Sequence, residues 1–129
     1  MKPPVWILHE TVLALHERLL AEFGGSAGVR DHGLLVSALA RPENLLAYGK
    51  PDIFTLAASY AFGLLKNHPF IDGNKRIGFA TTALFLECNG HQFQATESEA
   101  AIQTLALAAG AIGEAEFAAW LKANTKQRR

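Results

Sequence analysis

Nine consecutive residues, 68–76, bring together four side chains of different chemistry in this 129-residue chain. They read His-Pro-Phe-Ile-Asp-Gly-Asn-Lys-Arg, and they combine a possible base, a possible metal ligand, a tight turn and two cations. The flanking segments 57–65 and 77–86 are mostly apolar and are expected to form buried helices. Because loops held by a rigid scaffold often carry function, we expect the nine residues to lie at the floor of a pocket.

The second half of this segment has the features of an anion site. Gly73 and Asn74 form a turn directly before a helical pattern, and the first N–H groups of a helix lack acceptors within it and attract phosphate. Lys75 and Arg76 stand in the first helical turn, where the helix dipole favours acids, so a bound anion is expected to compensate them. We predict that these four residues bind phosphates and that the two cations also act catalytically by neutralising phosphoryl charge.

His68 and Asp72 each allow a chemical and a structural interpretation. A histidine at the end of a buried helix often only caps it, but one followed by an acid and a phosphate loop is better explained as a general base. Asp72 could cap the next helix or, beside bound phosphates, coordinate Mg²⁺, which takes carboxylate and phosphate oxygens. We favour the metal ligand because of the neighbouring residues. Phe70 is expected to anchor the loop in the core.

The remaining histidines and the single cysteine give weaker signals. His9 and His16 lie seven residues apart, which does not fit a zinc-binding His-Glu-x-x-His helix, and we expect both on a solvated helix face. Cys88 lies in an apolar stretch and is interpreted as a small core residue. One cysteine excludes an intramolecular disulfide and fits a reducing cytoplasm.

The composition predicts a single domain over residues 1–129. Half of the residues are hydrophobic and the formal net charge is zero, which argues against nucleic acid or an anionic membrane as the main partner. Residues 1–25 lack the pattern of a signal peptide, and no apolar run approaches the ~20 residues of a membrane span. We therefore expect a cytoplasmic protein with no nucleic-acid partner and no membrane partner.

Helical periodicity predicts an all-α fold, a helical bundle with two central buried helices and the phosphate-binding loop between them. The expected elements are, in order, a helix containing residues 12–23, a short helix from 31 to about 42, a loop over 41–51, central helices from 52 and over 74–88, an extended segment over 91–95, helices from 96 and around 117–121, and a frayed tail over 126–129. The shorter helices are expected to wrap the two central ones.

Residues 68–76 resemble the core motif of the Fic/Doc (Fido) superfamily, in its death-on-curing (Doc) toxin branch. The wider Fic form reads His-Pro-Phe-x-x-Gly-Asn-Gly-Arg-x-x-Arg; Lys75 stands where that form has its second glycine, and Phe79 where it has its second arginine. Both departures are those of the Doc branch. Similarity to the Doc pattern extends roughly over residues 9–121, including Gly28-Val-Arg-Asp31, so the resemblance implies a Fic/Doc-type helical bundle.

This resemblance implies a transferase that uses ATP and Mg²⁺. His68 would deprotonate a protein hydroxyl, Asp72 would coordinate Mg²⁺, and Gly73, Asn74 and Arg76 would cradle the phosphates. In Fic enzymes AMP is transferred, whereas the Doc branch implies a reversed nucleotide and transfer of the γ-phosphoryl group. By family, the target is a threonine of elongation factor Tu, whose phosphorylation halts translation.

The resemblance also implies a bacterial toxin–antitoxin pair. The inhibitory Ser/Thr-x-x-x-Glu-Gly/Asn helix of many Fic proteins is missing, because Glu43-Asn44 has Leu39 at the hydroxyl position. Inhibition is therefore expected from an antitoxin whose C-terminal segment occupies a groove near the active site. Three hypotheses stay open: a Doc-type protein Ser/Thr kinase toxin, which we prefer, a protein adenylyltransferase, and a catalytically weak module that binds an antitoxin.

Overall fold

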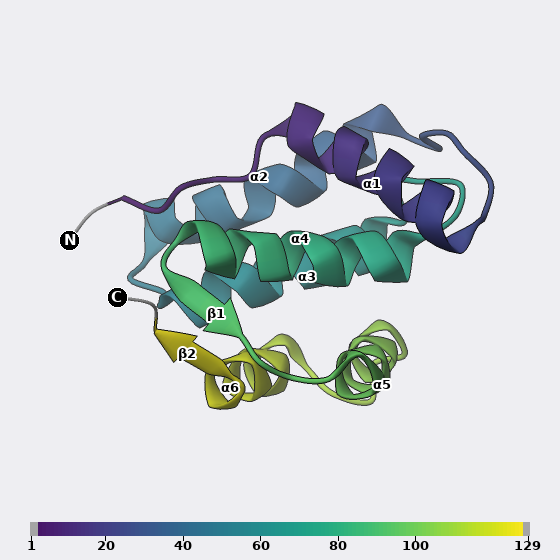
Figure 1. Cartoon of the computed structure of the whole chain (residues 1–129). Coiled ribbons are helices and arrows are strands. Elements are labelled where there is room, and N and C mark those ends of the chain that lie inside the picture. The colour runs from purple at the N-terminus through teal and green to yellow at the C-terminus, as the bar shows by residue number, and fades with distance from the viewer. Residues whose placement is uncertain (1–2, 128–129) are drawn as a thin grey trace.

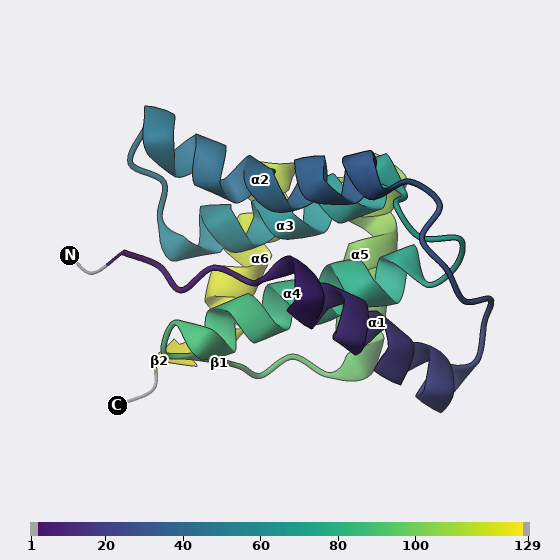
Figure 2. The ribbon, with the colours of Figure 1, turned by 90° about the horizontal axis from the view of Figure 1, so that it is seen from above.

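The computed structural model describes residues 3–127 and shows three layers of helices (Figures 1 and 2). Helices α3 and α4 form the middle layer, α1 and α2 cover one side of it, and α5 and α6 cover the other. Within the described residues the elements are α1 His9–Phe23, α2 His32–Tyr48, α3 Ile53–Asn67, α4 Asn74–Cys88, β1 His91–Phe93, α5 Glu97–Ala108, α6 Glu114–Ala123 and β2 Thr125–Gln127. The prediction of an all-α bundle is confirmed, with a short two-stranded ribbon added.

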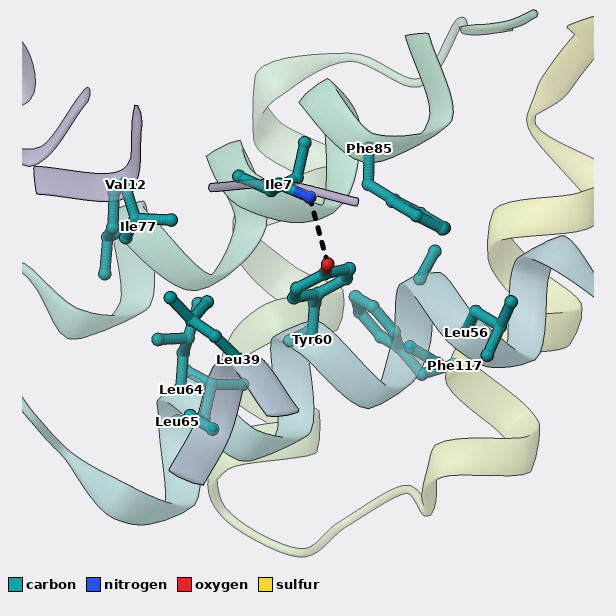
Figure 3. Close-up of a cluster of buried hydrophobic side chains, with 14 of the residues drawn as sticks. Ile7, Val12, Leu39, Leu56, Tyr60, Leu64, Leu65, Ile77, Phe85 and Phe117 are labelled. Carbon is teal, nitrogen blue, oxygen red and sulfur yellow. Dashed lines mark hydrogen bonds between the residues drawn. The ribbon is translucent and has the colours of Figure 1, made fainter. Parts of the chain in front are cut away.

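Helix α3 is the centre of the core because it lies between both outer layers. Nine of its fifteen residues are buried. Tyr60 packs against Phe85 of α4 with ring centroids 5.0 Å apart, and Phe117 of α6 belongs to the same buried cluster (Figure 3). The Tyr60 hydroxyl accepts a hydrogen bond from the Ile7 N–H at 3.1 Å, and burial raises the pKa of Tyr60 to about 12. Aromatic side chains of this size contribute strongly to core stability when buried.

Short polar side chains begin the helices where the sequence predicted them. At α2 the Asp31 carboxylate accepts a hydrogen bond from the Leu34 N–H at 2.9 Å, and at α3 Asp52 accepts one from the Thr55 N–H at 2.8 Å. A capping box formed by Thr96 and Glu99 opens α5, where the sequence predicted a helix from residue 96. Each cap satisfies a backbone donor that the helix itself leaves unpaired, so these local signals fix where the helices start.

Helix α2 continues to Tyr48, so the loop predicted over residues 41–51 is wrong for most of its length. Pro42 is buried inside the helix, although it lacks the N–H that would bond to the Ala38 carbonyl. That carbonyl oxygen lies against α3, 3.2 Å from where a Cβ on Gly63 would stand. Close packing of the two helices therefore outweighs the one lost hydrogen bond.

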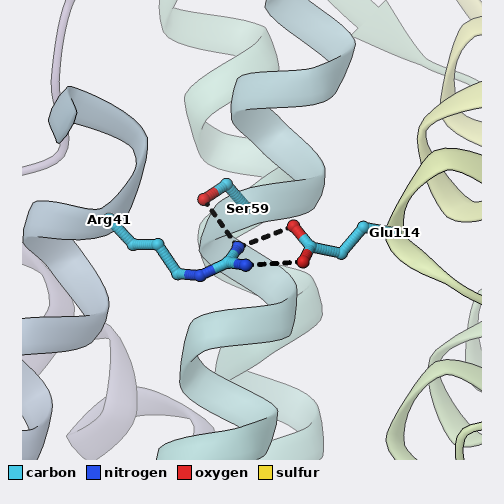
Figure 4. Close-up of polar contacts among 3 residues, drawn as sticks. All are labelled: Arg41, Ser59 and Glu114. Atoms are coloured by element: carbon cyan, nitrogen blue, oxygen red, sulfur yellow. Dashed lines mark hydrogen bonds and ion pairs between the residues drawn. The ribbon is translucent and has the colours of Figure 1, made fainter. Parts of the chain in front are cut away.

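The continued α2 helix carries Arg41 over α3 to α6 (Figure 4). Its guanidinium donates to the two carboxylate oxygens of Glu114, at 2.6 and 2.5 Å, and to the Ser59 hydroxyl of α3 at 3.0 Å. The Arg41 and Glu114 side chains are 34% and 31% exposed. A two-pronged arginine–carboxylate pair has a defined geometry, so this contact ties the two outer layers together across the middle one.

A two-stranded antiparallel ribbon follows α4 and ends the described chain. Strand β1 pairs with β2 so that Phe93 lies opposite Thr125. The extended segment predicted from residue 91 is confirmed over 91–93. Residues 126–127 lie in β2 and not in a frayed tail; the rest of that predicted tail, 128–129, lies outside the described residues.

Two further expectations concern the surface. Cys88 is exposed at the end of α4, so its interpretation as a core residue is wrong. Among residues 3–127, no helix combines the length and the apolar character that a membrane span requires.

Candidate active site

Residues 68–76 join α3 to α4 as an open loop followed by the first turn of α4 (Figure 2). Phe70 is 1% exposed and anchors the loop in the core, as predicted. The four polar candidates His68, Asp72, Lys75 and Arg76 are all exposed, as is the apolar Ile71. The loop therefore brings the predicted base, metal ligand and cations together on one surface, whereas Asn74 is 4% exposed and its side chain is turned inward.

The inward Asn74 side chain bonds to the loop backbone at Phe70 and orients the His68 ring. Asn74 Oδ1 accepts from the Phe70 N–H at 3.0 Å, and Nδ2 donates to the Phe70 carbonyl at 2.9 Å, which fixes the amide orientation. Nδ2 also lies 3.1 Å from His68 Nδ1. Because an NH₂ group only donates, His68 Nδ1 is the acceptor, and the neutral ring carries its hydrogen on Nε2.

The start of α4 has the geometry of a phosphate site. Gly73 adopts a left-handed conformation (φ 79°, ψ 17°), and no side chain caps the helix. The first N–H bonded back along the chain is that of Ile77, to the Gly73 carbonyl at 2.9 Å. The three preceding N–H groups of the helix start are those that normally bind anions. Lys75 and Arg76 are exposed beside them, and the Arg76 guanidinium lies 4.5 Å from the ring centroid of Phe23.

The Asp72 carboxylate is held in its charged form. Its Oδ2 accepts from the Ser26 N–H at 3.1 Å and its Oδ1 from the Gly73 N–H at 2.9 Å. The bond from Ser26 has the largest effect on the pKa of Asp72 and lowers it. The bond from Gly73 and the nearby charge of Arg76 lower this pKa further. The carboxylate thus bonds to the turn and does not cap the interior amides of α4, contrary to the structural alternative considered for it.

The donor set at Asp72 fits Mg²⁺ only together with phosphates. No group of three or more His, Cys, Asp or Glu side chains within residues 3–127 is arranged to hold a metal ion. Mg²⁺ in phosphate sites commonly uses one or two carboxylates and takes its other ligands from water and phosphate oxygens. A lone charged carboxylate next to an open helix start satisfies that requirement.

His16 of α1 supports the loop from behind and was not predicted to do so. It is 4% exposed, so the expected position on a solvated face is wrong. Its Nε2 lies 2.8 Å from the Asp72 carbonyl oxygen, and its ring stacks on Phe70 with centroids 3.8 Å apart. The spacing offered one signal, because His16 follows the buried Val12 by four residues and therefore shares its helix face.

The turn between α1 and α2 packs directly on the candidate loop. Val29 forms an isolated antiparallel bridge with Phe70, and the Ile71 N–H donates to the Gly28 carbonyl at 3.1 Å. Gly25 (φ 122°) approaches so closely that a Cβ there would lie 2.8 Å from Asp72 Oδ2. A glycine at position 25 is therefore required for this close contact between the turn and the loop.

Phe79 stands one helical turn after Lys75 but belongs to a different environment. Its ring lies 5.2 Å from that of Phe93 in β1 and 6.5 Å from that of Trp120 in α6. The position that carries an arginine in the wider Fic form is thus part of an aromatic cluster in this chain.

Neither of two cavities in this part of the molecule is lined by the polar residues of the loop, so these cavities do not provide the predicted pocket. A cavity of about 370 Å³ opens between α2 and α3, away from the candidate chemistry, and is lined by Ser37, Arg41, Asn44, Phe62, Gly63, Lys66 and Asn67. A second, of about 200 Å³, is lined by Leu13, His16, Glu17, Leu20, Ala27, Gly28, Val29, His32 and Phe70. Only this second cavity touches the loop, through Phe70.

Comparisons with known proteins agree with the motif. A model of the Fic/DOC family matches residues 6–86. The chain is 43% identical over 76 residues to "Toxin Doc" of Mycolicibacterium smegmatis, covering 57% of this chain and 58% of that protein. It is 33% identical over 84 residues to "Protein kinase doc" of Escherichia phage P1, covering 64% of this chain and 67% of that protein. The match thus spans less than two thirds of the first relative.

Proposed function

This chain belongs to the Fic/Doc family, as a member of its Doc branch, and we propose that it is a toxin that transfers the γ-phosphoryl group of ATP to a hydroxyl of a protein. The observation that carries the proposal is the juxtaposition of His68, the charged Asp72 and the open start of α4 on one exposed loop. The printed names of the two relatives, a toxin and a protein kinase, support it.

The arrangement of the loop supports the following role for each residue. The first amides of α4, with Lys75 and Arg76, would bind the phosphates and offset the charge that develops during transfer. Asp72 would hold Mg²⁺, which when bound would neutralise and orient the phosphates. His68 would accept the hydroxyl proton while the hydroxyl oxygen bonds to the γ-phosphorus and the bond from that phosphorus to the β–γ bridging oxygen breaks, releasing ADP.

Proton acceptance by His68 requires one rearrangement. The Nδ1 lone pair is occupied by Asn74, and Nε2 carries the hydrogen of the neutral ring. The ring must therefore release Asn74, with or without a change of tautomer, before it can take a proton. Hydrogen bonds of a catalytic group commonly reorganise when substrate binds.

The proposed partners follow from the family resemblance. The protein substrate would be a threonine of elongation factor Tu, and the chain would act in the bacterial cytoplasm, where ATP and translation are found. The cognate antitoxin would place its C-terminal segment in the cavity of about 200 Å³ beside α1, whose wall includes Phe70 of the loop and His16 behind it. An antitoxin there would press on the loop from the side that holds Asp72.

The test is a labelling reaction with ATP carrying ³²P at either the α or the γ position, with Mg²⁺ and purified elongation factor Tu. We expect γ label on the target with the wild-type chain and a loss of about 10²–10⁴ in rate with His68→Ala. His91→Ala, which removes an imidazole from β1, is the matched control and should label at the wild-type rate.

The other outcomes separate the alternatives. Transfer of α label would replace the kinase by the adenylyltransferase hypothesis. Growth arrest of bacteria that express a folded His68→Ala chain would refute the role of His68 as base. A wild-type chain that transfers neither label but binds the antitoxin tightly would favour the binding module.

A further inference from the structure

Arg30, in the turn between α1 and α2, bonds to three successive carbonyl groups at the end of α3. Its Nε donates to the His68 carbonyl at 2.7 Å and its Nη2 to the Asn67 carbonyl at 2.8 Å. Its backbone N–H donates to the Pro69 carbonyl at 2.7 Å. A cation at the C-terminal end of a helix is also favoured by the helix dipole, so both geometry and charge fix this residue against α3.

His68 adopts a backbone conformation that needs such support. With φ 52° and ψ 54°, it is the one non-glycine residue among residues 3–127 with a positive φ. The left-handed region is unfavourable for side chains with a Cβ and persists only where the surroundings enforce it. The same backbone angles determine where the His68 ring points, because they set the direction of its Cα–Cβ bond.

The His68 residue is thus held at two places by different elements. Arg30 holds its carbonyl from the α1–α2 turn, and Asn74 of α4 holds its ring through Nδ1 at 3.1 Å. The Asn74 contact needs the ring to be aimed at α4. If the carbonyls of α3 moved, the ring nitrogen would leave hydrogen-bonding distance of that amide.

We propose that Arg30 is a positioning residue for His68: it enforces the left-handed backbone that sets the direction of the imidazole, which meets Asn74 in the free protein and would accept the hydroxyl proton once that contact is released. This inference rests on the proposed function for its catalytic consequence. Its structural half, the orientation of the ring, does not depend on any activity.

The informative variant is Arg30→Lys. Lysine keeps the positive charge near the end of α3, but its single nitrogen cannot reproduce a rigid fork that spans two carbonyls. Arg30→Gln, which keeps an N–H donor and removes the charge, is the second variant. Arg18→Lys, an exposed position on α1, is the matched control.

The first readout is the ¹⁵N NMR spectrum of His68 in the free protein, at a pH where imidazole rings are neutral. The wild type and Arg18→Lys should show one protonated Nε2 and one unprotonated, hydrogen-bonded Nδ1. Both Arg30 variants should show the two nitrogen signals shifted toward each other, because the ring is no longer held in one tautomer. Circular dichroism confirms that each variant is folded.

The second readout is the kinetics of γ-phosphoryl transfer. Arg30→Lys should lower kcat by about 10–100-fold, since small misplacement of a catalytic group has effects of that size. KM for ATP should stay within about twofold, because the start of α4 that would bind the phosphates is not contacted by Arg30.

The outcomes are distinguishable from those of the proposed function. His68 signals that match the wild type in folded Arg30→Lys overturn the inference, whatever the activity. If the His68 signals change in the Arg30 variants while the wild type transfers no phosphoryl group, the positioning of His68 is supported and the proposed kinase activity is refuted. A lowered melting temperature with unchanged signals and unchanged kcat would reduce Arg30 to a helix cap.

Discussion

Replacement of Asn74 by alanine should destabilise the chain far more than an average loss of one amide, because it leaves two buried backbone groups unpaired. The Phe70 N–H and carbonyl both bond to this side chain, and Phe70 is 1% and Asn74 4% exposed. An unsatisfied buried group costs about 1–3 kcal/mol. For two such groups we therefore expect the free energy of unfolding to fall by about 2–6 kcal/mol, and the melting temperature by about 8–24 °C for a chain of this size.

Asn89→Ala is the matched control at the other end of the same helix. Asn89 also makes three hydrogen bonds, with the Val5 N–H at 2.7 Å, the Val5 carbonyl at 3.0 Å and the Phe85 carbonyl at 2.8 Å. The two bonds with Val5 are exposed, so water can replace them and the loss should be about 1 kcal/mol. Urea denaturation of both variants measures the difference. Equal losses would refute the conclusion that Asn74 satisfies the buried loop.

Three further results are expected. Gly25→Ala should reduce Mg²⁺-dependent transfer by about tenfold or more with little change in KM for the protein target, since its Cβ would stand only 2.8 Å from Asp72 Oδ2 and displace the carboxylate; unchanged activity would show that the carboxylate can move freely. Asp72→Asn should lower the denaturation midpoint at pH 7. The folded state lowers the pKa of this carboxyl, so the carboxylate stabilises the fold at pH values above the ordinary carboxyl pKa of about 3.9. The two midpoints should converge as the pH falls below that value, and a constant gap would contradict the sign. Phe79→Arg should lower the melting temperature by several degrees, because it disrupts ring contacts with Phe93 and Trp120; a stable variant would show that the cluster tolerates charge.

Local signals predicted the parts of the fold that local energies decide. Helix α4 spans the predicted residues 74–88, and α2 and α3 begin at the predicted positions, where Asp31 and Asp52 cap them. The site was recognisable for the same reason. Its residues are contiguous, and the glycine turn and the two cations are unusual at a helix start.

The missed features all depend on contacts between distant segments. Helix α2 passes Pro42 because it packs on α3, and no local pattern reports that packing. His16 was expected in water, yet it lies under Phe70, 54 residues further along the chain. Arg30 lies in the segment 28–31 that resembles the Doc pattern, but its acceptors are backbone carbonyls, so no side-chain motif predicts its contacts.

The ion pair between Arg41 and Glu114 has a consequence for exchanging parts between relatives. The family match ends at residue 86, before α5 and α6, yet Glu114 holds Arg41 and Phe117 fills the core that contains Tyr60. A fragment that stopped after α4 would leave a partly buried guanidinium without its carboxylate and open one side of α3 to water. If the motif-bearing segment were joined to the C-terminal half of a relative, that half would have to supply an acidic side chain facing Arg41 and an aromatic ring packed against α3.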